Sequence, residues 1–389
     1  MKELELRMKV VTPLFMGGAD NTQAELRPSS IKGLLRFWWR AIQPPEVIKS
    51  VAVNEQDNQA KGDKVIPEIV KKESKIFGGA GKDQGQSRVH IRIVKLQDPS
   101  IEAYRGKREQ VGITYLGYGV ANSQSNRKAI MPGYEFEVQI SLRDLTPSEE
   151  EEVMDALWCM THLGGMGSRS RRGFGSVVAT RDIYKSKDEL VQAIKVKLDR
   201  IRQRSQDQGG LPDYTAITKN TRVYILGPEN SWEKALDKVG VLLSQYRLGT
   251  RGQLAQIRRP QDFITETQEV KALASRGECP QKPPPRAVFG LPHNYFFIST
   301  RQNVQTEAEL QGTKITRRAS PLFIHIHQLA SNQYVPVVSF IPAKFLPKDS
   351  QLVLESKSNG KRCKLRLEDP PYEHIEDFLR KMPNSEVVL

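Results

Sequence analysis

The sequence has few cysteines and no long apolar run, and each shortage excludes a class of protein. Its three cysteines, Cys159, Cys279 and Cys363, lie far apart and form no C-x-x-C pair. We therefore expect no disulfide framework and no zinc site, and interpret all three as small buried side chains. No apolar stretch reaches the roughly 20 residues that span a bilayer, and the N-terminus lacks a signal-peptide core. These absences predict a cytoplasmic protein without membrane contact.

Sequence signatures of catalysis and of metal binding are missing as well. The chain contains no G-x-S-x-G, H-E-x-x-H or paired-carboxylate pattern. Residues 78–83 resemble a phosphate-binding loop, but they lack its first glycine and have Asp83 where a hydroxyl is required. His325 and His327 are spaced to share one face of a strand, yet no further metal ligands accompany them. We expect no metal, no cofactor and no catalytic residue.

The chain carries a large surplus of positive charge. Lysine and arginine number 59 against 45 aspartates and glutamates, which gives a formal net charge of +14. Such a surplus favours a polyanionic partner. Because no basic amphipathic anchor or lipidation motif is present, we expect nucleic acid rather than a membrane.

The first half has the pattern of a ferredoxin-like domain, the arrangement of the RNA-recognition motif. Alternating apolar and polar residues predict strands at 4–10, 89–93 and 134–140, and a fourth strand begins near Phe174. One helix is capped by Ser29 or Ser30 and stops at Pro44. Another starts at the capping box Thr146-Pro147-Ser148-Glu149 and ends at Gly164 and Gly165. The order β-α-β-β-α-β implies an antiparallel sheet with both helices on one face.

With 389 residues the chain is long enough for two domains, and we predict an α+β protein of two ferredoxin-like domains with insertions. The first domain covers residues 1–210 and the second covers 211–389. Insertions are expected near 44–87, much of it loop, and near 98–133. We interpret residues 185–204 as an exposed helix and residues 206–212 as the linker between the two domains. In the second domain we predict strands at 222–226, 321–328 and 334–341, and helices from Ser231 and near 372–381.

The strongest candidate for a binding site is the glycine-rich loop, residues 162–176, which reads H-L-G-G-M-G-S-R-S-R-R-G-F-G-S. Glycines let a backbone approach a ligand closely and expose its N–H groups, and arginines add charge and planar donors. That chemistry suits an RNA backbone, whereas the plainer alternative is a turn with solvated arginines. The candidate residues are Gly165, Gly167, Ser168, Arg169, Ser170, Arg171, Arg172, Gly173, Phe174 and Gly175.

Two further segments have similar chemistry. The first predicted helix presents its N-terminus, which attracts phosphate, and a basic face, although a solvated polar face is the alternative. Trp39 is either a core residue or a base-stacking one. The second segment is a basic loop that leads into the strand at 321–328. The candidates are Arg27, Ser29, Ser30, Lys32, Arg36, Trp39, Arg40, Arg317 and Arg318.

These segments resemble the RAMP superfamily of CRISPR systems, and within it the subunit-one family of type III-B (Cmr) effector complexes. The resemblance lies in T-P-L-F-M-G-G-A-D at 12–20, R-P-S-S-I-K-G-L-L-R-F-W-W-R at 27–40, the glycine-rich loop, and shorter matches such as V-F-G-L-P and R-R-A-S-P-L. It implies two ferredoxin-like domains in a multi-subunit ribonucleoprotein. It also implies contact with the 3′ region of CRISPR RNA, with single-stranded target RNA and with other Cmr subunits. Target cleavage and nucleotide cyclisation would belong to those other subunits.

Two alternatives remain at this point. Some RAMP proteins are metal-independent endoribonucleases that process CRISPR RNA, and they often use an early histidine as general acid or base. Here the first histidine is His90, and we interpret His162, beside the glycine-rich loop, as structural. A scaffold subunit that contacts only proteins is the other alternative, but it would gain nothing from the +14 charge.

Overall fold

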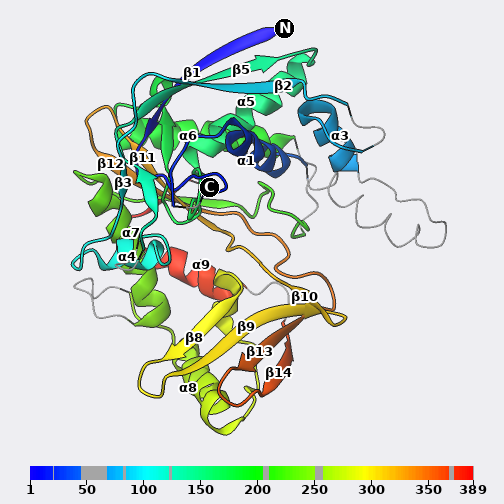
Figure 1. Cartoon of the computed structure of the whole chain (residues 1–389), viewed down its shortest axis with the longest axis vertical. Helices are drawn as coiled ribbons and strands as arrows, with labels where there is room; N and C mark the ends of the chain where they lie inside the picture. Colours follow the sequence, from blue (N-terminus) through cyan, green and yellow to red (C-terminus); the bar gives the residue numbers. More distant parts are fainter. Residues whose placement is uncertain are drawn as a thin grey trace, which may run out of the picture. The chain divides into compact units, whose positions relative to one another are not determined.

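The structure is a computed structural model that describes residues 1–20, 22–44, 68–81, 85–121, 125–204, 210–249, 257–367 and 372–388 (Figure 1). Its contacts divide the chain into two compact units. The first comprises Met1–Gly240, Phe323–Ile341 and Asn384–Leu389, and the second comprises Val241–Leu322 and Pro342–Pro383. Both units combine helices with antiparallel sheets, so the α+β class is confirmed.

The first unit contains an antiparallel sheet in the order β2-β5-β1-β6. Its strands are β1 (Lys2–Val10), β2 (Val89–Lys95), β5 (Glu135–Leu142) and β6 (Val177–Ala179). The register pairs Leu6 with Val138 and Met8 with Phe136, and all four side chains are buried. The alternation in the sequence therefore predicted the core face correctly. The fourth strand starts later than expected, because Phe174 lies buried in the turn before it.

Helices α1 (Pro28–Ala41) and α5 (Pro147–His162) pack together on one side of this sheet (Figure 1). The predicted capping box is present, since the Thr146 hydroxyl accepts a hydrogen bond from the Glu149 N–H and the Glu149 carboxylate accepts one from the Thr146 N–H. The predicted serine cap of α1 is wrong. Arg27 occupies the N-cap without a side-chain hydrogen bond, and Pro28 starts the helix because its fixed φ suits the first helical position.

A second antiparallel sheet in the first unit has the order β11-β12-β7-β15. It comprises β7 (Arg222–Ile225), β11 (Leu322–Gln328), β12 (Tyr334–Phe340) and β15 (Glu386–Val387). All of β11 and nearly all of β12 are buried, although β11 contains His325, His327 and Gln328. The sequence predicted three of these strands and missed the two-residue β15.

Helix α6 (Lys187–Gln203) confirms the helix predicted at 185–204 but corrects its exposure. Leu190, Ile194 and Leu198 recur at helical spacing and are fully buried in the core of the first unit. The many charges between them masked this apolar stripe in the sequence.

A buried carboxylate fixes α6 to α5. The Asp155 side chain is wholly buried and pairs with Lys197 at 2.9 Å and with Arg200 and Arg204. Asp155→Asn should therefore lower the free energy of unfolding by about 3 kcal/mol, because it leaves those cations around a neutral amide. Urea denaturation would measure the loss, with Glu151→Gln as control, since Glu151 pairs with Arg200 at the surface. Equal unfolding midpoints for the two variants would contradict the prediction.

Both predicted insertions contain regular elements. In the first, α3 (Glu68–Phe77) corrects the loop interpretation and buries Ile69, Ile76 and Phe77, while residues 45–67 and 82–84 lie outside the described residues. The second contains the strands β3 (Ile101–Ala103) and β4 (Lys128–Ile130), which pair with each other, and the short helix α4 (Val111–Leu116). The predicted linker at 206–212 also falls largely outside the described residues.

The second unit is built on an antiparallel sheet in the order β10-β9-β13-β14, with β8 also paired to β9 (Figure 1). Val270 and Leu273 of α8 pack with Val304 and Leu354 of the sheet. The sequence predicted none of this sheet. The elements of the second unit are α8 (Gln261–Arg276), η2 (Pro285–Phe289), β8 (His293–Phe297), β9 (Gln302–Leu310), β10 (Thr313–Ile315), β13 (Gln351–Ser356), β14 (Arg362–Arg366) and α9 (Glu373–Arg380). Helix α7 (Trp232–Leu248) precedes them in the chain.

The expectation of three unpaired cysteines is wrong for two of them. Cys279, exposed on the loop after α8, forms a disulfide with Cys363 of β14, with the Cα atoms 5.7 Å apart. The two lie 84 residues apart in the sequence, and only the fold brings them within bonding distance. Cys159 is free and buried, as predicted.

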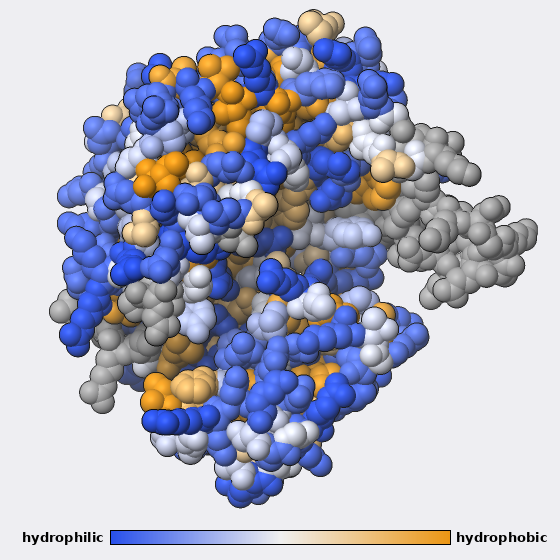
Figure 2. All heavy atoms as spheres, in the orientation of Figure 1, coloured by the Kyte–Doolittle hydropathy of each residue, from blue (hydrophilic) through white to orange (hydrophobic). Residues whose placement is uncertain are grey.

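Hydrophilic residues predominate on the face shown in Figure 2, as a charged content of 27% leads one to expect. None of the helices in the described ranges has the length and apolar character needed to cross a membrane.

Candidate nucleic-acid interface

The glycine-rich loop is a tight double turn between α5 and β6. Gly167, Gly173 and Gly175 have φ angles of +78°, +81° and +63°, and Arg169 has +62°. The Arg172 N–H closes one turn by donating to the Arg169 carbonyl at 2.7 Å. Glycine is therefore needed at these positions for its backbone conformation.

These glycines allow the loop backbone to lie close to other segments of the same chain. A Cβ on Gly167 would lie 2.5 Å from the Phe15 carbonyl oxygen, and one on Gly175 would lie 1.9 Å from that of Met166. The Gly175 N–H donates to the Pro13 carbonyl at 3.0 Å. Gly167 and Gly175 thus join the loop to the segment after β1, which is a structural role that the sequence interpretation missed.

The same loop connects the two sheets of the first unit. The Ile324 N–H of β11 donates to the Arg171 carbonyl at 3.1 Å, and the Ile326 N–H donates to the Ser176 hydroxyl at 3.0 Å. Phe174 is fully buried, with its ring 5.7 Å from that of Phe15. Most of the loop is consequently rigid framework, and only its outer residues remain accessible.

The arginines of the loop differ in their surroundings. The Arg171 guanidinium lies 4.3 Å from the Phe323 ring centroid and 5.3 Å from that of Phe37 on α1, so this side chain joins α1 to β11. Arg172 is half-buried. Arg169 is exposed and donates to the Tyr118 carbonyl of the second insertion. Arg169 is the loop cation best placed for a ligand.

The basic face predicted on α1 is partly neutralised by a buried glutamate. Arg36 and Arg40 pair with Glu73 of α3 at 2.5 and 2.8 Å, and the Glu73 side chain is only 6% exposed. Lys32 donates to the Ser87 hydroxyl at 2.6 Å, and burial, followed by the nearby Arg36, lowers its pKa. These three residues support the fold in addition to any role at the surface.

The remaining candidates on the first helix divide into core and surface. Trp39 is 1% exposed and donates to the Glu152 carboxylate at 2.9 Å, so it is a core residue that cannot stack on a base in this structure. Arg27, half-buried, pairs with Glu25 at 3.3 Å, and Ser29 is exposed and Ser30 half-buried in the first turn.

Arg317 and Arg318 belong to the second unit. Arg317 is exposed, whereas the Arg318 guanidinium donates to the Lys344 carbonyl and its backbone pairs with Leu291.

Sequence reasoning missed three cations of the second insertion that accompany the loop. Arg127 donates to the Ser168 hydroxyl at 3.2 Å, and Lys128 donates to the Gln23 side chain at 3.2 Å. Arg105 donates to the Ser125 carbonyl at 3.2 Å. In the described part of the chain, neither Arg105 nor Arg127 has a carboxylate partner. Their signal in the sequence was the mixture of basic residues with tyrosines at 104–118 and 127–128.

Three of the six histidines, His162, His325 and His327, are buried. His162 is fully buried between the Trp158 carbonyl at 2.9 Å and the Tyr184 hydroxyl at 3.0 Å, and burial, followed by His327, holds its pKa well below the usual value. His325 and His327 are fully buried too. Across the residues that the structure describes, no group of three His, Cys, Asp or Glu side chains is placed to hold a metal ion.

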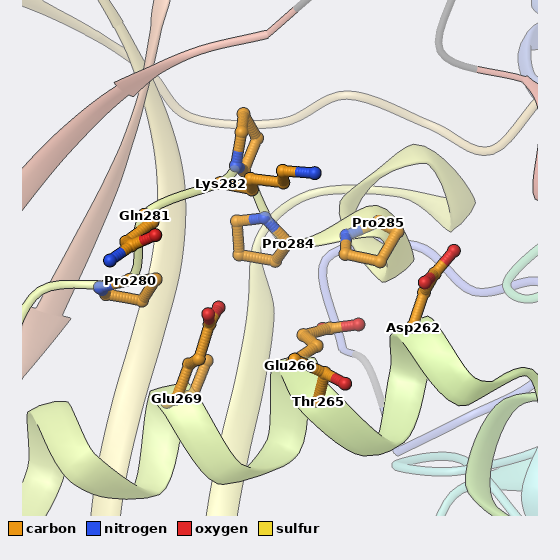
Figure 3. A pocket seen from close by; sticks show the side chains of 11 residues that line it. Asp262, Thr265, Glu266, Glu269, Pro280, Gln281, Lys282, Pro284 and Pro285 are labelled. Carbon is orange, nitrogen blue, oxygen red and sulfur yellow. The ribbon is translucent and has the colours of Figure 1, made fainter.

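A pocket of about 320 Å³ in the second unit lies between α8 and the proline-rich segment 280–285. Asp262, Glu266 and Glu269 point from α8 towards that segment (Figure 3). Glu266 is paired with Arg286 at 3.0 Å. Carboxylates repel phosphate, so this pocket is a poor site for RNA.

Comparison with known proteins agrees with the resemblance seen in the sequence. The model of the RAMP superfamily matches residues 7–178. The CRISPR system Cmr subunit Cmr1-1 of Pyrococcus furiosus is 26% identical over 350 residues, which cover 83% of this chain and 82% of the relative. Cmr subunit Cmr1-2 of the same organism is 28% identical over 197 residues, 46% of this chain and 95% of the relative.

The crystal structure of Cmr1 from Pyrococcus furiosus in its apo form has the same fold. It aligns over 100% of this chain and 99% of its own, with a TM-score of 0.57 and 18% identity. The chain is homologous to the Cmr1 subunits of Pyrococcus furiosus, and its residues 7–178 match the model of the RAMP superfamily.

Proposed function

We propose that this chain is a non-catalytic, RNA-binding subunit of a type III-B CRISPR effector ribonucleoprotein. It contacts the 3′ region of the CRISPR RNA, helps to capture single-stranded target RNA for antiviral defence, and works with other Cmr subunits in the cytoplasm. The homology to Cmr subunits and the +14 net charge support this proposal.

The observation that carries the proposal is the cluster of cations around the glycine-rich loop. We name it the basic rim and define it as Arg105, Arg127, Lys128 and Arg169. These residues come from the second insertion and the loop, and the contacts of Arg127 with Ser168 and of Arg169 with the Tyr118 carbonyl hold the two segments together. Arg105 and Arg127, which have no carboxylate partner among the described residues, can release the counterions of a phosphate chain at little cost.

We also propose that the chain comprises two ferredoxin-like domains, residues 1–210 and 211–389. Support comes from strand order, because both four-stranded sheets place the second, third, first and fourth strands side by side, β2-β5-β1-β6 and β11-β12-β7-β15. The two compact units do not coincide with these two proposed domains, because both four-stranded sheets belong to the first unit.

The salt dependence of RNA binding tests the basic rim. Arg105→Gln together with Arg127→Gln should reduce the slope of log K against log salt by about 1.4, and weaken binding roughly 20-fold at 0.1 M salt. Fluorescence anisotropy with a labelled single-stranded RNA measures both quantities. The matched control is Lys195→Gln with Lys219→Gln, which removes the same charge from exposed positions of the first unit. Equal slopes for the two double variants would exclude the rim from the site.

The same samples separate the alternatives. A scaffold subunit would show no RNA binding by the full chain. A nuclease would produce shorter RNA on a denaturing gel, with or without a chelator, and we expect intact RNA because His162 is buried away from any ligand.

A further inference from the structure

One exposed aromatic side chain lies beside the basic rim without any role in the core. Tyr118 is 70% exposed, although tyrosines usually bury much of their ring. It follows α4, and its carbonyl accepts the hydrogen bond from Arg169. The ring therefore projects from the same short segment that the glycine-rich loop holds in place.

The backbone around Tyr118 is firmly fixed. The Val120 N–H donates to the Gly117 carbonyl at 2.9 Å, which places Tyr118 and Gly119 at the apex of a tight turn. A Cβ on Gly117 would lie 2.8 Å from the Phe174 ring, so the turn packs directly on the loop. On the other side, the Ile113 N–H of α4 donates to the Asp237 carboxylate at 3.0 Å.

We propose that Tyr118 is a base-stacking residue that selects unpaired RNA at the basic rim. An exposed ring on a fixed backbone turn beside a cation is suited to single strands, because cations hold the phosphates while a base stacks on the ring. Bases inside a duplex are not available for this contact. The inference rests on the proposed RNA-binding function and adds to it the residue that distinguishes single-stranded from double-stranded RNA.

The test compares the full-length chain with Tyr118→Ala, Tyr118→Phe and Tyr118→Trp. Alanine should weaken binding of a labelled single-stranded oligoadenylate between about 5-fold and 100-fold, whereas phenylalanine and tryptophan should bind within about twofold of the wild type. The salt slope should not change, because no charge is removed, and affinity for a blunt RNA duplex should also stay the same. Tyr214→Ala, at another exposed tyrosine of the first unit, is the control.

Photocrosslinking with 5-iodouridine RNA provides a second readout that does not depend on affinity, and we expect the crosslinked peptide to contain Tyr118. Wild-type affinity in Tyr118→Ala, or an equal loss in Tyr118→Phe, would overturn the inference while leaving the basic rim intact. Absence of any RNA binding by the wild-type chain would instead refute the proposed function itself, and this inference with it.

Discussion

Replacing Gly175 by alanine should lower the free energy of unfolding of the first unit by about 5 kcal/mol. The new Cβ would lie 1.9 Å from the Met166 carbonyl oxygen, at a φ of +63° that alanine adopts only with strain. The backbone cannot shift to relieve this contact, because the Met166 N–H donates to the Gly175 carbonyl at 2.8 Å and the Gly175 N–H donates to Pro13. Steric overlap and conformational strain therefore add.

Soluble expression and urea unfolding followed by tryptophan fluorescence would measure this effect. Gly33→Ala is the matched control, since Gly33 lies on the exposed face of α1 with no atom within 4 Å of its would-be Cβ. Alanine should stabilise that helix by up to about 1 kcal/mol. If Gly175→Ala unfolded at the same urea concentration as Gly33→Ala, the loop would not be a rigid connection between the two sheets.

The glycine-rich loop shows which features of the site the sequence could predict and which it could not. The density of glycines predicted a backbone that something approaches closely, and the structure shows such close approaches at Gly167, Gly173 and Gly175. What the backbone approaches depends on residues distant in sequence, such as Phe15 and Leu236, which no local pattern identifies. The sequence predicted that the loop backbone approaches a ligand. The structure shows that this backbone approaches other segments of the same chain.

The predicted basic face of α1 illustrates a second limit. Helical spacing correctly placed Arg36 and Arg40 on one side of the helix, but their partner is Glu73, in a segment that carries no sustained periodicity. The buried carboxylate on α3 cannot be inferred from the charges on α1. Conversely, Arg105 and Arg127 seemed part of an irregular insertion, and only the fold brings that insertion to the loop.

Strands with one buried and one exposed face were predicted well, whereas the sheet of the second unit was not predicted. The alternation in β1 and β5 extends over whole strands. β8 and β10 are short and pair with their neighbour β9, and β9 in turn pairs with β13 farther along the chain. Leu354 of β13 pairs with Thr306 of β9, for example. The disulfide between Cys279 and Cys363 depends on the same long-range pairing, and no cysteine spacing indicates it.

Three histidines lie together in the core of the first unit. The ring of His327 lies 5.1 Å from that of His162 and 5.6 Å from that of His325. Each imidazole has a backbone carbonyl within reach of one ring nitrogen, from Trp158, Gly164 or Asp182. Burial lowers the pKa of His325 to about 4 and, together with His325, that of His327 to about 3.

The free energy of unfolding should therefore fall as the pH is lowered from 7 to 5. The unfolded chain protonates these histidines near pH 6.5, while the folded chain keeps them neutral, so acid favours unfolding. The stabilisation is complete above pH 6.5. Below it, the contributions of His325 and His327 each fall by about 1.4 kcal/mol per pH unit, or roughly 4 kcal/mol together at pH 5, and His162 acts in the same direction. This loss continues until the folded pKa values are reached. Carboxylates titrate mainly below this window.

Urea unfolding at a series of pH values between 5 and 7 would reveal the slope. His327→Gln should reduce it by about 1.4 kcal/mol per pH unit, because a neutral amide replaces one of the buried rings. His90→Gln, which removes an exposed histidine of β2, controls for the loss of a titrating side chain elsewhere. A wild-type stability that did not change across this range would mean that the three rings are accessible to protons in the folded protein, and the joint between the two sheets would then be open to water.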